Sequence, residues 1–462
     1  MSRTLRTEVR PIDPHRLEPL IGAERVETLV RTAAEVRTAL GDRQIVNINS
    51  TTTGGGVAEM LATLIGYVRG VGIDAEWLVI AGEPEFFAVT KRIHNGLYGS
   101  PGDGGDLGPA ERVVYEQTAA ANIAPICAEV RSGDVVIVHD PQPAGLIDAL
   151  VERGASVVWR CHVGYDSVNE WTERAWAFVR PYVEGAHAHV FSRELFAPVW
   201  IDRTRMRAIP PSIDPFTPKN AELEPSEVIE LLVAAGLLTA HESRPNSRVT
   251  RRADVVREGA PPETSVPLVV QVSRWDRMKD MVGVLEGFVE YVDSPAHLVL
   301  AGPAVTGVSD DPEGEEVWNE TCAAWSRLPK AGRSRVHLAA IPMADPVENA
   351  LVVNALQRHA SVVAQKSLAE GFGLTVAEAM WKSRPVVASA VGGIVDQVVD
   401  GETGLLVRDP HDLRAFGAAV ERLLGDQAEA TRIGWRARTH IAEHFLGDRH
   451  LLQYAELLTD IL

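Results

Sequence analysis

The stretch Gln44-Ile45-Val46-Asn47-Ile48 is a short apolar run rich in β-branched residues, and a polar, glycine-rich turn follows it from Asn49 to Gly56. After the turn, apolar residues return at helical spacing, at Val57, Met60, Leu61, Leu64, Ile65 and Val68. The run predicts a strand and the spacing predicts a helix. Strand, turn and helix in succession indicate an α/β fold with a parallel, doubly wound sheet.

The same alternation occurs on both sides of a proline-rich break. The strand-like runs before the break are residues 76–80, 134–138, 156–160 and 189–191. Those after it are residues 268–272, 297–301, 335–338, 361–365 and 385–389. The break, Ile209-Pro210-Pro211-Ser212-Ile213-Asp214-Pro215, predicts a hinge, because proline cannot donate to a sheet and ends helices. We therefore expect two Rossmann-like doubly wound domains facing a cleft, with ligands beyond the carboxyl ends of the strands.

The expected domains are residues 1–213, on the acceptor side, and residues 214–440, which bind the nucleotide-sugar. Residues 441–462 are expected to form a helix that packs back on the first domain. Residues 241–267 are rich in Arg, Pro, Ser and Glu and show little periodicity, which favours a surface insertion.

Composition limits the possible functions. The 462 residues suggest about two or three domains, and 45% hydrophobic residues suffice for sizeable cores. The formal net charge of −18 argues against general binding to nucleic acids or anionic membranes. No apolar stretch approaches the roughly 20 residues of a membrane span. The cysteines, Cys127, Cys161 and Cys322, give neither a disulfide framework nor a zinc spacing, so a cytoplasmic location is the simplest expectation.

The first motif, Thr53-Gly54-Gly55-Gly56, lies between a predicted strand and a predicted helix. Its glycines allow backbone N–H groups to approach an anion at a helix N-terminus. The motif matches neither the dinucleotide-binding nor the Walker pattern. A tight turn without a ligand remains the alternative.

The second motif is Ser273-Arg274-Trp275-Asp276-Arg277-Met278-Lys279-Asp280, directly after the first strand of the second half. Two cations just past a strand end suit a diphosphate, because arginine grips phosphate oxygens in a planar fork and lysine adds a point charge. Arg274 and Lys279 are the candidates, whereas Arg277 is expected to be a surface charge.

The third motif is Glu370-Gly371-Phe372-Gly373-Leu374-Thr375-Val376-Ala377-Glu378. Gly371 and Gly373 open a turn into a predicted helix over residues 374–382, whose first N–H groups favour phosphate. The two carboxylates can accept hydrogen bonds from sugar and ribose hydroxyls. Paired glutamates also occur in glycosidases, but sequence spacing does not give the carboxylate separation on which that mechanism depends.

Two polar groups end strands of the first half, at His139-Asp140-Pro141-Gln142-Pro143 and at Arg160-Cys161-His162. At these positions we expect them to face the cleft, although a lone histidine is more often structural. Cysteine nucleophile chemistry at Cys161 has no supporting local signature.

Together these residues resemble the family 4 retaining glycosyltransferases of the GT-B fold. In the second half the resemblance lies in the second and third motifs and continues through Pro385-Val386-Val387-Ala388, Val391-Gly392-Gly393-Ile394 and Asp400-Gly401-Glu402-Thr403-Gly404. The first half is similar to a narrower branch, the glycosyltransferring trehalose synthases and their trehalose-phosphorylase relatives. That similarity lies in residues 49–59, 86–91, 138–143, 159–162 and 210–215, with His94-Asn95 and Lys219-Asn220.

The resemblance implies a role for each matching residue. Catalytic roles fall to four residues, His139, Glu370, Arg274 and Lys279. Contacts with the donor fall to Gly55, Gly56, Gly371, Phe372, Gly373, Leu374 and Glu378. Contacts with the acceptor fall to Arg160, His162 and Asp166. Arg274 and Lys279 hold the diphosphate, Glu370 the transferred sugar, Glu378 the ribose, and His139 approaches the donor 6-hydroxyl or the acceptor.

The implied reaction moves glucose from ADP-glucose or UDP-glucose to glucose with retention, forming α,α-trehalose, without a metal or other cofactor. No Asp-x-Asp lies at a strand end, in agreement with a metal-free site. His162 is followed by Val163-Gly164-Tyr165-Asp166 where the family has Ile-Asp, a change that bears on the acceptor. A trehalose phosphorylase and a non-catalytic sugar-nucleotide sensor remain alternatives. The donor base and the oligomeric state stay open, with a homodimer as the expected assembly.

Overall fold

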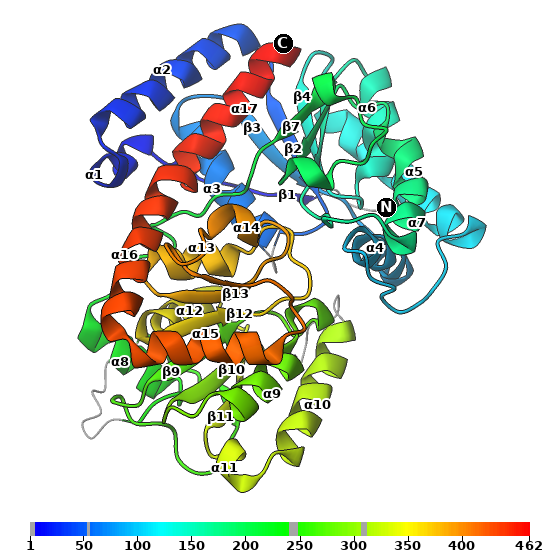
Figure 1. The fold of residues 1–462 in the computed structure, drawn as a ribbon. Coiled ribbons are helices and arrows are strands. Elements are labelled where there is room, and N and C mark those ends of the chain that lie inside the picture. The colour runs from blue at the N-terminus through cyan, green and yellow to red at the C-terminus, as the bar shows by residue number, and fades with distance from the viewer. Residues whose placement is uncertain (1–4, 53–55, 240–247, 306–311) are drawn as a thin grey trace. The chain divides into compact units, whose positions relative to one another are not determined.

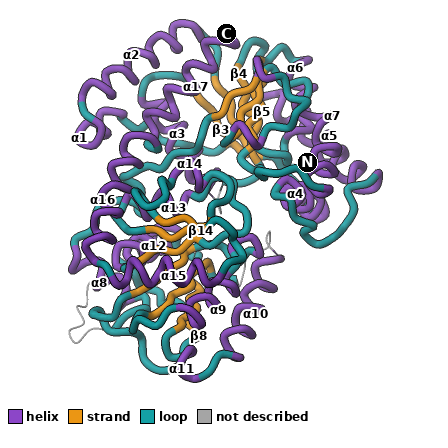
Figure 2. Tube along the Cα trace, viewed as in Figure 1, coloured by secondary structure: helices purple, strands orange, loops and turns teal. Residues whose placement is uncertain are grey.

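The computed structural model describes residues 5–52, 56–239, 248–305 and 312–462 (Figure 1). Gly55 and part of the expected insertion lie outside these residues. The chain forms two compact units. The first comprises Met1–Ile213, Glu370–Phe372 and Phe445–Leu462, and the second comprises Asp214–Ala369 and Gly373–His444. Each unit is built around one sheet, drawn in orange in Figure 2.

The first unit contains a seven-stranded sheet in the order β1-β3-β2-β4-β5-β6-β7. The strands are β1 (Leu5–Arg6), β2 (Ile45–Asn49), β3 (Ala75–Val79), β4 (Val135–His139), β5 (Ser156–Cys161), β6 (Ala188–Phe191) and β7 (Met206–Ala208). Six of them are parallel, and β1 adds an antiparallel edge to β3. The predicted doubly wound parallel sheet is therefore confirmed, with one antiparallel strand that the sequence pattern did not indicate.

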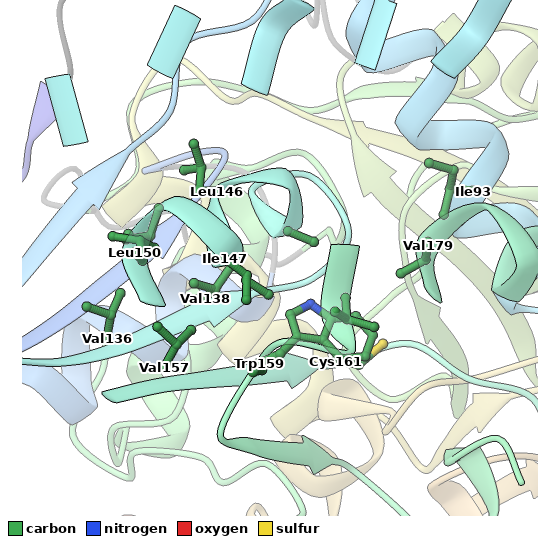
Figure 3. Packing of buried hydrophobic residues seen from close by; sticks show 14 of the residues in the cluster. Ile93, Val136, Val138, Leu146, Ile147, Leu150, Val157, Trp159, Cys161 and Val179 are labelled. Carbon is green, nitrogen blue, oxygen red and sulfur yellow. The ribbon is translucent and has the colours of Figure 1, made fainter. Parts of the chain in front are cut away.

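Helices cover both faces of this sheet, which explains why its central strands are rich in apolar residues on both faces. The helices are α1 (Glu18–Ile21), α2 (Ala23–Leu40), α3 (Gly56–Gly70), α4 (Pro84–Leu97), α5 (Pro109–Glu129), α6 (Ile147–Glu152), α7 (Glu170–Val183) and α17 (Gly447–Ile461). Alternate residues of β4 enter opposite cores: Val136 and Val138 pack on one side, Val135 and Ile137 on the other. Figure 3 shows the first of these cores, where Val136 and Val138 lie near Ile147 and Leu150 of α6.

The C-terminal helix belongs to the first unit. In Figure 1, α17 runs beside α2, and the two helices are in contact. Arg25 of α2 pairs with buried Asp448 of α17 over 2.7 Å, and His450 Nδ1 lies 2.9 Å from the Ser212 hydroxyl. Apolar residues of α17 also enter the core on the α2 and α3 side of the sheet.

The second unit contains a seven-stranded sheet in the order β14-β13-β12-β9-β10-β11-β8. The strands are β8 (Asp254–Val256), β9 (Leu268–Val272), β10 (His297–Pro303), β11 (Val336–Ile341), β12 (Val362–Gln365), β13 (Val386–Ser389) and β14 (Leu405–Val407). Six are parallel, and β8 lies antiparallel to β11 at the edge. Apart from β8, this is the Rossmann strand order.

The helices of the second unit surround a core that contains Val269, Leu298 and Leu338 of the central strands. They are α8 (Pro225–Ala234), α9 (Met281–Tyr291), α10 (Pro312–Arg327), α11 (Lys330–Arg333), α12 (Pro346–His359), α13 (Leu374–Trp381), α14 (Ile394–Gln397), α15 (Leu413–Gly425) and α16 (Gln427–His444). Within the described part of the chain, no helix combines the length and the apolarity that a membrane span requires.

The described part of residues 241–267 contributes to the second unit. Strand β8 extends its sheet, and Arg251 pairs with Glu348 of α12 over 2.7 Å. The segment is thus tied to the unit by backbone pairing and by an ion pair. The sequence did not predict this short strand, because the segment contains few apolar residues and an edge strand can pair without being fully buried.

Candidate functional site

The switch point of the second sheet brings two of the sequence motifs to one edge. Strand β9 lies between β10 and β12, and the chain runs to one side of β9 before it crosses to the other. The loops after β9 and β12 therefore leave the carboxyl edge of the sheet side by side, where ligands of such sheets bind. The first loop carries Arg274 and Lys279, and the second leads to Glu370 and α13.

The loop after β9 holds its cations in place through Asp276. One carboxylate oxygen of Asp276 lies 3.0 Å from Nη2 of Arg274, and the other accepts the N–H of Met278 over 2.8 Å. The second bond caps the short 3-10 helix Arg277–Lys279 that ends in Lys279. The side chain of Arg274 is 45% exposed, so its guanidinium is oriented by Asp276 yet accessible to a ligand.

The two loops are bonded to each other. Lys366, which directly follows β12, is fully buried and forms an ion pair with Asp280 at the end of the first loop. The backbone N–H of Leu368 donates to the carbonyl of Met278 over 2.7 Å. Because breaking a buried ion pair leaves a charge without compensation, these contacts fix the spacing between the loops.

Helix α13 begins in the way that the sequence predicts. Gly373 has φ 90°, a left-handed conformation that strongly favours glycine, and Leu374 starts the helix. The preceding residues, Glu370–Phe372, group with the first unit. There, a Cβ atom on Gly371 would lie 2.7 Å from the carbonyl oxygen of His162, so only glycine fits this approach.

Glu378 lies on α13 and is 4% exposed. Lys219 approaches it, with 3.9 Å between the ammonium nitrogen and a carboxylate oxygen. Lys382, one turn further along, donates to the side chains of Gln357 and Asn220 over 2.8 and 3.0 Å. Burial lowers the pKa of Lys382 to about 7, and the Glu378 carboxylate opposes this shift. Glu378 is thus held in a polar, largely enclosed setting, in which its carboxylate can accept hydrogen bonds from hydroxyl groups.

The switch point of the first sheet lies between β2 and β4. Of the glycine motif after β2, Gly56 starts α3 and Gly55 lies outside the described residues. His139 ends β4 and is buried, with 3% of its surface exposed. Its Nδ1 lies 3.1 Å from Nε2 of His162, and its Nε2 lies 3.1 Å from the side-chain oxygen of Asn47 on β2. Both ring nitrogens of His139 are therefore engaged by side chains.

Asp140 connects this group to the next strand. Its φ of 63° is left-handed, a conformation that aspartate tolerates better than most residues. Its carboxylate accepts the backbone N–H of His162 over 2.7 Å, and its own N–H donates to the carbonyl of Arg160 over 2.7 Å. Burial raises the pKa of Asp140 to about 7.

Arg160 is fully buried beneath these residues. Its Nη2 donates to the Ser192 hydroxyl over 3.4 Å, whereas Nε and Nη1 have no hydrogen-bond partner among the described residues. Burial, together with the Arg160 charge, lowers the pKa of His139 to about 3 and that of His162 well below its usual value. Both histidines are therefore neutral near pH 7.

The predicted site residues thus fall into two groups and one outlier. Arg274 and Lys279 lie in the loop that is bonded to the loop before α13. His139, Arg160 and His162 adjoin one another in the first unit. Asp166 lies apart from these contacts and forms an ion pair with Arg193. The roles assigned to all of these residues remain predictions.

Sequence reasoning missed Asn47 and Lys366. Each is a polar residue in or directly after a mainly apolar strand that is buried on both faces. A buried polar group needs a hydrogen-bond partner, so a polar residue in such a strand already indicates a polar contact inside the unit. Within the described ranges, no cluster of three or more histidine, cysteine or acidic side chains has the arrangement of a metal site. The metal-free reading stays a prediction.

Comparison with known proteins shows the family to which the chain belongs. Residues 47–198 match the family described as the N-terminal domain of trehalose synthase, and residues 254–440 match the glycosyl transferases of group 1. A trehalose synthase of Pyrococcus horikoshii is 35% identical over 96% of this chain and 95% of its own length. This chain belongs to the trehalose synthase family. It is accordingly a trehalose-related glycosyltransferase and a hexosyltransferase.

A trehalose phosphorylase is similar to the chain in sequence, and several solved structures are similar to it in fold. A trehalose phosphorylase of Pleurotus sajor-caju is 25% identical over 91% of this chain and 58% of its own length. The solved trehalose-6-phosphate synthase OtsA has a TM-score of 0.69 at 12% identity, over 91% of this chain and 99% of its own. The Anabaena protein HepE, solved with UDP-glucose, has a TM-score of 0.63 at 15% identity, over 90% and 99%. These structures show the GT-B fold.

Proposed function

We propose that this protein is a retaining glycosyltransferase that moves glucose from a nucleoside-diphosphate-glucose to free glucose and so forms α,α-trehalose. The observation that carries the proposal is the pair of cations, Arg274 and Lys279, at the switch point of the second sheet. The similarity to trehalose synthases over nearly the whole chain supports the product. The structure of HepE with UDP-glucose supports the class of donor.

In this proposal the second unit supplies most contacts to the donor. Arg274 and Lys279 neutralise the diphosphate, and the first N–H groups of α13 add partial positive charge. Glu378 binds the ribose hydroxyls, and Glu370 binds hydroxyls of the transferred glucose. These groups stabilise the charge that collects on the leaving diphosphate, so that transfer rests on positioning and electrostatics. The proposed site needs no metal.

The acceptor glucose is assigned to His162 and Asp166 in the first unit. Arg160, predicted as a third contact, is fully buried and acts through its charge instead. Retention follows if the acceptor hydroxyl attacks from the face that the diphosphate leaves and the diphosphate takes its proton. No protein nucleophile is required by this route. Such a reaction gives an α-linkage at the transferred carbon, and attack by the α-anomeric hydroxyl of glucose makes the product α,α-trehalose.

A second candidate is a trehalose phosphorylase. The Pleurotus relative favours it, and inorganic phosphate suits the same two cations. The two functions differ in their need for a nucleotide, since a phosphorylase cleaves trehalose with phosphate alone.

The test is product analysis. The protein is incubated with ADP-glucose or UDP-glucose and a panel of sugars, and the anomeric carbons of the products are identified by NMR. We expect α,α-trehalose from glucose with one of the two donors. A β-linked product would refute retention, and an α-linked product with another acceptor only would refute the trehalose assignment. Cleavage of trehalose by phosphate without nucleotide would identify the phosphorylase.

A further inference from the structure

A chain of side chains runs from the interior of the first unit to His162. Asn47 of β2 and His139 of β4 line a cavity of about 90 Å³ between the sheet and α2, α3 and α17. Most of its other lining residues are apolar, with Thr32, Tyr67 and Tyr454 as further exceptions. Among the described residues, Asn47 is the partner of His139 Nε2 over 3.1 Å, and His162 is the partner of Nδ1 over 3.1 Å.

The direction of the hydrogen bonds in this chain follows from the chemistry of the groups. The side-chain oxygen of Asn47 can only accept, so Nε2 of His139 carries the proton. A neutral imidazole then has a bare Nδ1, which accepts from Nε2–H of His162. His162 is neutral as well, and its own Nδ1 is therefore left with a lone pair. This nitrogen has no hydrogen-bond partner among the described residues. It is also absent from the fully buried polar atoms that lack a partner, so it is accessible to a ligand.

We propose that Asn47 is a positioning residue which, through His139, fixes the tautomer of His162 so that its Nδ1 accepts a hydroxyl of the acceptor sugar. The assignment of a sugar to this nitrogen rests on the proposed function, whereas the tautomer does not. His139, whose two ring nitrogens are both engaged, then acts through His162 and touches no substrate, in place of the direct approach to donor or acceptor that the resemblance implies. A nitrogen that can only accept favours a ligand with a suitably placed O–H and discriminates against one that lacks it.

The lowered pKa values of both histidines agree with this arrangement, because a protonated ring would donate from both nitrogens. Asn49 offers a matched control. It lies on the same strand with 4% of its surface exposed, against 6% for Asn47. Its amide bonds Trp77 and the carbonyl of Thr51 and does not contact the two histidines.

The experiment measures the tautomer directly. The intact protein is labelled with ¹⁵N-histidine, and the His162 resonances are assigned by their loss in His162→Gln. We expect an unprotonated Nδ1 and a protonated Nε2 in the free protein. Asn47→Leu should yield a mixture of tautomers, Asn47→Asp should keep the original one, and Asn49→Leu should leave it unchanged. A protonated Nδ1 in the unsubstituted protein, or no change in Asn47→Leu, would overturn the proposal. The measurement on the unsubstituted protein tests the tautomer even if Asn47→Leu fails to fold.

A kinetic experiment tests whether the Nδ1 of His162 accepts a hydroxyl of the acceptor sugar. Monodeoxy-glucose acceptors should include one that reacts at least about tenfold more slowly than glucose, as expected for one lost hydrogen bond. In Asn47→Leu this difference should shrink to less than about threefold, with the KM of the donor unchanged. A difference that persists in Asn47→Leu would overturn the link to the acceptor. Failure of all glucose transfer would instead refute the proposed function and leave the NMR result to decide the tautomer.

Discussion

The side chain of Gln271 accepts the backbone N–H of Lys366 over 3.0 Å, and its Nε2 donates to the carbonyl of Lys279 over 2.7 Å. Gln271 lies near the carboxyl end of β9 and is fully buried. One amide group thus bonds the start of the loop after β12 to the end of the loop that carries the two cations. The geometry of the proposed diphosphate site depends on this residue although it lies beneath the surface.

We therefore expect Gln271→Leu to damage both stability and donor binding. It leaves the Lys366 N–H and the Lys279 carbonyl buried without their partner, which costs about 1–3 kcal/mol for each unsatisfied group. Urea unfolding should show the loss of stability, and the KM of the nucleotide-sugar should rise while that of the acceptor stays the same. Unchanged values of both the unfolding midpoint and the donor KM would contradict this reading.

Arg274→Ala and Lys279→Ala should each lower kcat/KM for transfer about 30- to 1000-fold, because loss of one donor to a developing charge costs about 2–4 kcal/mol. Arg277→Ala, in the same loop, is the control. Its guanidinium is held by Glu316 and Glu320 of α10 and its side chain is 42% exposed. Such surface pairs contribute about 0–1 kcal/mol, so a change below about fivefold is expected. Equal losses in all three variants would mean that the loop is sensitive as a whole.

Activity should survive exhaustive treatment with EDTA, because the proposed site uses guanidinium, ammonium and backbone N–H groups to neutralise the diphosphate. Initial rates with and without chelator, measured at equal ionic strength, test this. Loss of activity that Mg²⁺ or Mn²⁺ restores would refute the metal-free mechanism. Mild stimulation by Mg²⁺ would not, since the released diphosphate itself binds that ion.

Acid should destabilise the second unit through His337. Burial first, and then the neighbouring His297, lower the pKa of His337 to about 3 from an ordinary value of 6.5. Between these values the unfolded chain binds more protons than the folded one, so the free energy of unfolding falls as the pH drops below 6.5. From pH 7 to pH 5 this one group accounts for up to about 2 kcal/mol.

His337→Leu should remove that part of the pH dependence. The measurement is the difference in urea midpoint between pH 7 and pH 5, compared between the variant and the unsubstituted protein. His187→Leu serves as a control in the first unit, away from the paired histidines of β10 and β11. An identical pH dependence in His337→Leu would show that His337 is not the responsible group.

The fold could be read from the sequence because its signals are local and repeated. Each central strand is buried on both faces, so residues such as 268–272 and 385–389 form apolar runs that predict strands. All four edge strands escaped notice because each has only two or three residues: β7 and β14, and the antiparallel strands β1 and β8. The pairing partners of β1 and β8 are distant in the sequence, and no local pattern shows such a partner.

The candidate site was predictable in part for a related reason. In a parallel sheet a residue that follows a strand lies at the carboxyl edge, so Arg274, His139 and His162 could be placed from the sequence. The contacts that those side chains make could not be predicted from the sequence. The burial of Arg160 and the bonds of His139 to Asn47 and His162 depend on neighbouring strands, which the sequence orders along the chain but not in space.

The return of α17 to the first unit has a consequence for the synthesis of the protein. Ala455, Leu457 and Leu458 complete the core on one face of the first sheet, yet they leave the ribosome after residues 214–444 have been made. At about 5–20 residues per second, a nascent chain waits roughly ten seconds to a minute for them. During that interval an apolar face of the first sheet and α2 remains uncovered. The unit that is synthesised first is therefore completed last, and a chain that ends before Phe445 lacks the residues that cover this apolar face.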